Sequence, residues 1–152
     1  MVLVANVGCD QVSKTIARNT LSNAPISFVH DHITLIKVQN PGAFLSLGSD
    51  LPFFLKIVLL NVLPLAILAL AGIYVLTKAN LSRLTTLATC FVIGGGLGNL
   101  YDRMVYGSVT DFLHIKFGIF QTGIFNLADV SIMIGALVIV FEAIRYREPQ
   151  AG

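Results

Sequence analysis

Charged side chains are scarce in this sequence of 152 residues. Asp, Glu, Lys and Arg make up 12% of it, while 55% of the residues are hydrophobic and the mean hydropathy is +0.81. Soluble globular domains carry about 25% charged residues, so the shortage argues against an ordinary soluble domain and indicates a chain that faces lipid. The net charge of +2 is too small and too scattered to predict a nucleic-acid partner.

Cysteine is also scarce, and no low-complexity run or internal repeat is visible. Cys9 and Cys90 both lie in apolar segments, where buried free thiols are the ordinary expectation, and their spacing supports no disulfide or metal framework. His30 and His32 would share one face of a strand, but two histidines without a third ligand are more typical of a solvated face. No basic region precedes the apolar amino terminus, so we expect no cleaved signal peptide.

Long apolar runs predict four transmembrane helices, because about twenty apolar residues cross a bilayer. The clearest runs from Ile57 to Leu76, where Pro64 is expected to kink the helix. The first segment is shorter than ideal and carries Asp10 and Lys14 on one face, because they are four residues apart. That pair has two readings, an internal ion pair or part of a functional site. We expect spans at about 1–19, 55–77, 84–104 and 126–145.

Two polar segments, 20–50 and 107–125, separate these runs. The run from Ile26 to Asn40 is rich in β-branched residues and ends at Asn40-Pro41-Gly42, which predicts a strand at one membrane surface. Basic residues flank the spans on the other side, and the positive-inside rule puts that side, with both termini, in the cytoplasm. These residues are Lys78, Arg83, Arg145 and Arg147. Both polar segments should therefore face outward.

The stretch from Gly94 to Asp129 holds three of the eight acidic residues, Asp102, Asp111 and Asp129. Ionisable groups at membrane depth are costly and are functional candidates by default. Asp111 would share an apolar strand face with Val109 and Leu113, a local inconsistency of the kind that marks sites. The stretch offers no recognisable serine or cysteine nucleophile paired with histidine. An oxygen-only metal site is possible, but two aspartates that share a proton and activate water against an amide give the simplest enzyme.

Structural readings of the same residues stay open. Asn126 and Asp129, three residues apart, could cap the fourth helix. Asn99 and Asp102 have the same spacing and could share a helical face. Asp102 is followed by Arg103, which could be its charge partner at a helix end. The glycines at 94, 95, 96 and 98 are more typical of close helix packing, with a small-xxx-small spacing, than of a phosphate loop.

Five short motifs resemble those of lipoprotein signal peptidase (signal peptidase II), in that family's order and across nearly the whole chain. They are Asp10-Gln11-Val12-Ser13-Lys14, Asn40-Pro41-Gly42-Ala43-Phe44, Gly98-Asn99-Leu100-Tyr101-Asp102-Arg103, Val109-Thr110-Asp111-Phe112 and Phe125-Asn126-Leu127-Ala128-Asp129. The resemblance implies a single integral membrane protease domain over 1–152, mainly α, with four transmembrane helices and a small extracytoplasmic β-sheet. One departure is the amino terminus, where only nine residues precede Asp10.

The same resemblance implies an aspartic endopeptidase that cuts diacylglyceryl-modified prolipoproteins before the lipidated cysteine. It implies Asp111 and Asp129 as the catalytic pair. Supporting or substrate-contacting positions would be Asp10, Lys14, Asn40, Gly98, Asn99, Asp102, Arg103 and Asn126. It implies no metal and no cofactor, a monomer in contact with membrane lipid, and inhibition by cyclic peptide antibiotics such as globomycin. The location would be the bacterial inner membrane, with the site near the outer leaflet.

Two other classes of function compete with the protease. In a small transporter or proton-coupled channel, the same carboxylates would form a relay. In a non-enzymatic scaffold, polar residues aimed into lipid would be an unexplained cost. Asp111 on a surface β segment suits peptide binding better than a pore, so the sequence favours the protease.

Overall fold

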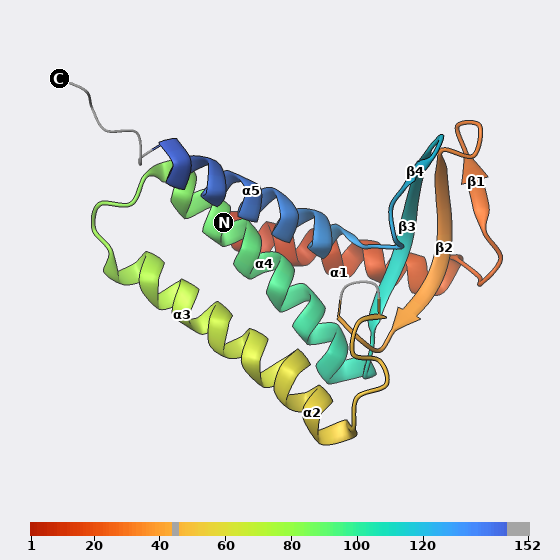
Figure 1. Ribbon diagram of the computed structural model, residues 1–152, viewed down its shortest axis with the longest axis horizontal. Coiled ribbons are helices and arrows are strands. Elements are labelled where there is room, and N and C mark those ends of the chain that lie inside the picture. The colour runs from red at the N-terminus through yellow and green to blue at the C-terminus, as the bar shows by residue number, and fades with distance from the viewer. Residues whose placement is uncertain (44–45, 146–152) are drawn as a thin grey trace.

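A computed structural model describes residues 1–43 and 46–145, so Phe44 of one motif and the basic residue Arg147 lie outside the described residues. The elements in chain order are α1 (Val2–Thr20), β1 (Ile26–Phe28), β2 (Ile33–Asn40), α2 (Phe53–Ile57), the π-helical turn η2 (Val58–Val62), α3 (Leu63–Thr77), α4 (Arg83–Tyr106), β3 (Val109–Phe117), β4 (Phe120–Gln121) and α5 (Leu127–Arg145). The sheet stands at one end of the helices (Figure 1).

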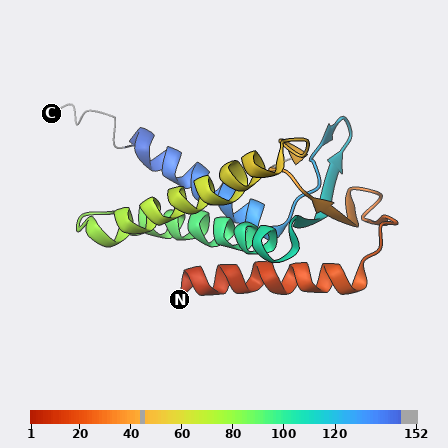
Figure 2. The ribbon, with the colours of Figure 1, turned by 90° about the horizontal axis from the view of Figure 1, so that it is seen from below.

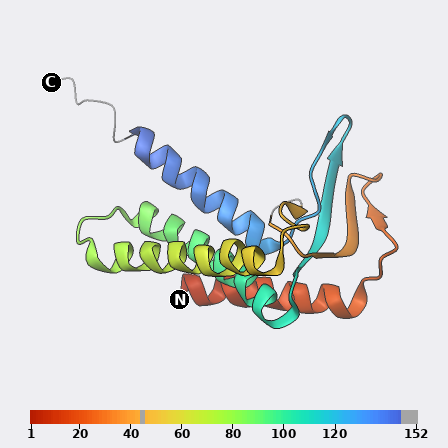
Figure 3. The same ribbon diagram turned by 60° about the horizontal axis from the view of Figure 1, so that its bottom comes forward.

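Helix α4 is the centre of the helical part, in contact with α1, α3 and α5. Figure 2 shows α4 between α1 and α3, and Figure 3 shows α5 leaning away from them toward the carboxyl terminus. Glycines make this close approach possible. A Cβ at Gly94 would meet the side chain of Asn6, one at Gly95 the carbonyl of Ala128, and one at Gly96 the side chain of Leu68. The packing interpretation of these glycines is therefore confirmed, with each facing a different helix.

Among residues 1–43 and 46–145, the helices long and apolar enough to cross a membrane are the three at Phe53–Thr77, Arg83–Tyr106 and Leu127–Arg145. They coincide with the segments predicted at 55–77, 84–104 and 126–145, and they make this a multi-pass membrane protein. The helix predicted over 1–19 is present as α1 but does not meet the same criterion. Three charged residues along it, Asp10, Lys14 and Arg18, account for the difference.

The helical distortion expected at Pro64 lies just before it. Residues Val58–Val62 form a π-helical turn, and Pro64 falls in the first turn of α3. Proline has no N–H to donate and its ring crowds the carbonyl four residues back, here that of Leu60. A π-helical turn absorbs both effects within a continuous helix.

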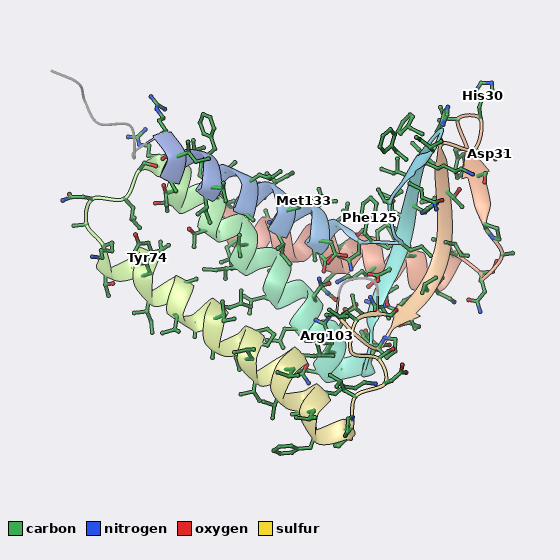
Figure 4. All side chains as sticks on the ribbon, viewed as in Figure 1. His30, Asp31, Tyr74, Arg103, Phe125 and Met133 are labelled. Carbon is green, nitrogen blue, oxygen red and sulfur yellow. The ribbon has the colours of Figure 1, made fainter. Side chains whose placement is uncertain are left out.

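The sheet is antiparallel, with strand order β1-β2-β3-β4. The single strand predicted from Ile26 to Asn40 is wrong, because the chain folds into a hairpin in which Val29, His30 and Asp31 all have positive φ. Figure 4 shows His30 and Asp31 at the tip of that hairpin. His30 and His32 consequently share no strand face. His32 instead stacks on Phe117, and its Nδ1 lies 2.8 Å from the Lys116 carbonyl oxygen.

Candidate active site

Asp10 and Lys14 form a fully buried ion pair on the inner face of α1. Lys14 Nζ lies 2.9 Å from Asp10 Oδ2 and 3.5 Å from Asp102 Oδ2, and all three side chains are 0% exposed. The other Asp10 oxygen, Oδ1, accepts the backbone N–H of Ala128 at 3.0 Å. Asp10 therefore ties α1 to the beginning of α5, so the ion pair is both a structural feature and a neighbour of the candidate site.

Asp102 is paired with residues of α1, so the predicted partnership with Arg103 is wrong. Arg18 Nη1 lies 3.4 Å from Asp102 Oδ2, while the backbone N–H of Thr110 donates to the same oxygen at 3.0 Å. Consecutive residues of a helix do not face each other, which separates Asp102 from Arg103. The Arg103 side chain instead donates through Nη2 to the Gly42 carbonyl at 2.9 Å, near the connection between β2 and α2 (Figure 4).

Arg18 and Gln11 also contact Asp102, and neither was predicted as a site residue from the sequence. Arg18 donates to the Thr110 hydroxyl at 3.1 Å and lies 4.3 Å from the centre of the Tyr106 ring. Gln11 Nε2 donates at 3.1 Å to Asp10, to the Gly98 carbonyl and to Asp102. The available signal was helical spacing, because Arg18 follows Lys14 by four residues and so shares its face.

A glycine is required at position 98 because Asp10 lies against the backbone there. A Cβ at that position would collide with Asp10 Oδ2 and would stand 3.1 Å from Asp10 Cγ. The absence of a side chain therefore lets α1 and α4 approach until the carboxylate of Asp10 lies against the backbone of α4.

Asn99 joins the buried lysine to Asp129. Its Oδ1 accepts from Lys14 Nζ at 2.8 Å, and its Nδ2 donates to Asp129 Oδ1 at 2.8 Å. Lys14 fixes which end of the amide accepts, because an ammonium group only donates hydrogen bonds. The amide group is thereby oriented with its donor toward the half-buried Asp129.

Asp111 is held by two asparagines on β3, next to the helix ends. Asn40 Nδ2 donates to its Oδ2 at 3.0 Å, and Asn126 Nδ2 donates to its Oδ1 at 2.6 Å. Only 3% of Asp111 is exposed. Burial raises the pKa of its carboxyl to about 6; neighbouring Asp129 also raises it, and the amides of Asn40 and Asn126 oppose the rise.

Asn126 and Asp129 form the expected capping box at the start of α5. The Asn126 N–H donates to Asp129 Oδ2 at 3.2 Å, and the Asp129 N–H donates to Asn126 Oδ1 at 3.0 Å. The remaining donor of Asn126 is the group that contacts Asp111. The capping interpretation is confirmed, and the same residues bring Asp111 and Asp129 to one place.

Asn40 also shapes the loop after β2. Its Oδ1 accepts the N–H of Gly42 at 3.0 Å, and its Nδ2 donates to the Ala43 carbonyl at 3.0 Å as well as to Asp111. One buried amide thus fixes both the turn and the Asp111 carboxyl.

The geometry gathers all ten predicted site residues at the end of the helices that meets the sheet. Asp111 and Asp129 share the contact with Asn126, and neither lies within 4.0 Å of a cationic group in the described part of the chain. Across residues 1–43 and 46–145, no three His, Cys, Asp or Glu side chains gather closely enough to hold a metal ion. Two carboxyl groups beside one another, held by neutral amides, are suited to exchanging protons with a bound substrate.

Lipoprotein signal peptidases of three bacteria resemble this chain over different shares of its length. A lipoprotein signal peptidase of Sulfurihydrogenibium is 34% identical over 135 residues, covering 88% of this chain and 83% of that protein. One of Aquifex aeolicus is 35% identical over 105 residues, 69% of this chain and 62% of that protein. One of Yersinia pseudotuberculosis is 52% identical over 60 residues, 40% of this chain and 36% of that protein.

Solved structures resemble the fold. A bacterial membrane enzyme determined at 2.3 Å resolution superposes with a TM-score of 0.86 at 24% identity, covering 98% of this chain and 88% of that one. Another, at 1.9 Å, gives 0.83 at 25% identity, covering 93% and 89%. The profile of signal peptidase (SPase) II matches residues 2–145. The chain therefore belongs to the signal peptidase II family.

Proposed function

We propose that this protein is a membrane aspartic endopeptidase that removes signal peptides from diacylglyceryl-modified prolipoproteins, cutting before the lipidated cysteine. The observation that carries the proposal is the meeting of Asp111 and Asp129 at Asn126, which contacts both. Membership of the signal peptidase II family supports the class of substrate.

In the proposed mechanism the two aspartates have different roles. Asp111, nearly fully buried and with a pKa raised to about 6, holds a proton more readily and polarises the scissile carbonyl. Asp129, half-buried, takes a proton from water as the water oxygen attacks the carbonyl carbon. When the C–N bond breaks, a proton held by the pair passes to the departing amine, and a carboxylic acid and an amine remain. None of these proposed reaction steps requires a metal ion.

The other site residues would position this pair. The amides of Asn40, Asn99 and Asn126 donate hydrogen bonds to the two carboxyls and fix their orientation. Asp10, Lys14, Asp102 and Gly98 would hold α1 against α4. Arg103 lies next to the pair without contacting it, and we assign it a role toward the substrate.

We also propose that α1 is a fourth spanning helix, so that one domain over 1–152 lies in the bacterial inner membrane as a monomer. Both termini would be cytoplasmic, and the aspartate pair would lie near the outer leaflet. Single cysteines at Asn80 should react with an impermeant thiol reagent only from inside. Cysteines at Asp31 or Lys116 should react from outside, and the reverse pattern would overturn the orientation.

The direct test is cleavage of a lipidated prolipoprotein by the purified protein in detergent. We expect a shortened product, no product from the same precursor without its lipid, full activity in EDTA, and inhibition by globomycin. Liposome flux of ions or solutes without any cleavage would support a transporter instead. Activity lost in EDTA and restored by a divalent metal would contradict the aspartic mechanism.

A further inference from the structure

A cavity lies at the end of the helices farthest from the aspartate pair. Its volume is about 710 Å³, and it is bordered by α3, α4, α5 and the connection between α3 and α4. Its wall is largely apolar, with Leu70, Leu81 and Ile139 among its lining residues. Tyr74, also in the lining, marks this end of α3 in Figure 4.

Glu142 of α5 lines this cavity and is 5% exposed. The hydroxyls of Ser82 and Thr85 donate to its Oε2 at 2.5 and 3.2 Å. Within the described ranges, its Oε1 accepts no hydrogen bond and no cationic group lies within 4.0 Å of the carboxylate. Burial of an ionised carboxylate is costly unless a partner neutralises it.

Support for the start of α4 explains part of this arrangement. The Ser82 hydroxyl accepts the N–H of Thr85 while donating to Glu142, so the carboxylate braces the helix cap. That role uses Oε2 alone. The second oxygen, Oε1, takes no part in it.

We propose that the cavity binds a basic side chain from the amino-terminal region of the substrate's signal peptide. The proposal rests on the proposed function. Signal peptides begin with a positively charged region, followed by about 7–15 apolar residues, and the positive region stays on the cytoplasmic side. The proposed orientation places the Glu142 end of the helices on that same side.

The length of the helices fits such a substrate. At about 1.5 Å per helical residue, α5 spans roughly 20 Å between Asp129 and Glu142. An apolar signal-peptide segment of about 7–15 residues spans roughly 11–23 Å as a helix. In Figure 1, α4 runs between α3 and α5 along this distance. A peptide lying along it would reach the aspartate pair with one end and Glu142 with the other.

The test pairs two enzymes with two lipidated precursors. One precursor keeps the lysines of its signal peptide, and the other has glutamine in their place; the enzymes are wild type and Glu142→Gln. With wild type, we expect loss of the lysines to raise KM roughly tenfold with kcat unchanged. With Glu142→Gln, KM for the lysine precursor should rise by the same factor, and the two precursors should then be cleaved alike.

Controls separate this proposal from a folding defect and from the proposed function. Glutamine can still accept from Ser82, so Glu142→Gln should keep the wild-type thermal midpoint. Asp31→Asn, an exposed acidic position at the hairpin tip, should leave the tenfold discrimination intact. If both precursors are cleaved by wild type with equal KM, this inference is overturned and the protease stands; no cleavage of either overturns the protease.

A lipid amine is the competing occupant. If Glu142→Gln raises KM equally for both precursors, and only in bilayers containing phosphatidylethanolamine, the cavity binds lipid and the peptide assignment is overturned. Crosslinking gives an independent measurement if Glu142→Gln is unstable. A cysteine at Asn80, which lines the cavity, should form a disulfide with a cysteine in the precursor's basic region, in an enzyme made inactive by Asp111→Asn. Absence of that crosslink would also contradict the proposal.

Discussion

Two groups of carboxylates lie at the same end of this protein, and they are held in opposite ways. In the ion-pair cluster, defined as Asp10, Lys14, Arg18 and Asp102, each carboxylate faces at least one cation within 4.0 Å. In the aspartate pair, Asp111 and Asp129, the donors to the carboxyl oxygens are asparagine amides and one backbone N–H.

The difference assigns a structural role to the ion-pair cluster and a chemical role to the aspartate pair. A carboxylate with a cation within 4.0 Å is tied to that partner, which suits it to anchoring one helix against another. A carboxyl held by neutral amides in a buried place keeps its position while its charge can change. Asn99 is the junction, because it accepts from Lys14 of the cluster and donates to Asp129 of the pair.

The largest effect on activity is expected when one member of the aspartate pair loses its charge. Asp111→Asn and Asp129→Asn should each lower kcat by roughly 10⁴-fold, because general acid–base catalysis by that carboxyl is lost. Both variants should fold and still bind the lipidated precursor, measured by its retention on immobilised enzyme. Near-normal turnover by either variant would contradict the assignment of the pair.

Removal of a charge from the ion-pair cluster should act on stability instead. Asp102→Asn leaves Lys14 and Arg18 with one carboxylate fewer in a fully buried place, and breaking a buried pair in this way costs about 3–5 kcal/mol. We expect lower expression and a lower thermal midpoint along with lower activity. Asp31→Asn, exposed at the hairpin tip, should change stability by less than about 0.5 kcal/mol. A stable but inactive Asp102→Asn protein would move Asp102 to the catalytic group.

Several features of both carboxylate groups could be predicted from the sequence, because helical and strand periodicities indicate which residues share a face. They predicted the three strongly apolar helices, the Asp10–Lys14 pair and the Asn126–Asp129 cap, all of which the structure contains. Spacing alone does not predict which carboxylate faces which cation across two helices. Adjacency in sequence suggested Arg103 for Asp102, whereas helix packing brings Arg18 from α1.

The sheet was predicted less well for a related reason. β-branched residues continue on both sides of residues 29–31, so composition gave no sign that the strand reverses there. The meeting of Asp111 with Asn40 and Asn126 depends on the pairing of β2 with β3 and on the start of α5. Contacts between distant segments were suggested by the resemblance to a family and not by local pattern. The catalytic roles of these residues stay a prediction.

The pH dependence of stability would distinguish Asp111 from the carboxylates of the ion-pair cluster. Its folded pKa of about 6 lies above its ordinary value of 3.8, so the folded state binds this proton more tightly than the unfolded state does. The contribution of Asp111 to stability is therefore full below about pH 4 and falls as pH rises to about 6, by on the order of 3 kcal/mol. Asp111→Asn should lack this part of the pH dependence in thermal unfolding measurements.

The activity should also depend on the protonation of Asp111. Because the proposed role of Asp111 needs its protonated form, kcat/KM should decline as pH rises above about 6, by up to about tenfold per pH unit. A profile of kcat/KM against pH, measured with the lipidated precursor, tests this. A rise in kcat/KM through pH 6 would instead make Asp111 the group that accepts the proton from water.

The smallest change that should disturb the ion-pair cluster without touching a charge is Gly98→Ala. The new Cβ would collide with Asp10 Oδ2 and stand 3.6 Å from the Ala128 Cβ, so α1 must move away from α4 at a cost of about 1–3 kcal/mol. Gly72→Ala in α3 is the matched control, because its Cβ would meet nothing within 4 Å and alanine favours a helix over glycine by up to about 1 kcal/mol. Thermal midpoints should therefore move in opposite directions, down for Gly98→Ala and slightly up for Gly72→Ala. If both rise, the ion-pair cluster tolerates a wider spacing of α1 and α4, and the close approach of Asp10 to Gly98 does not limit stability.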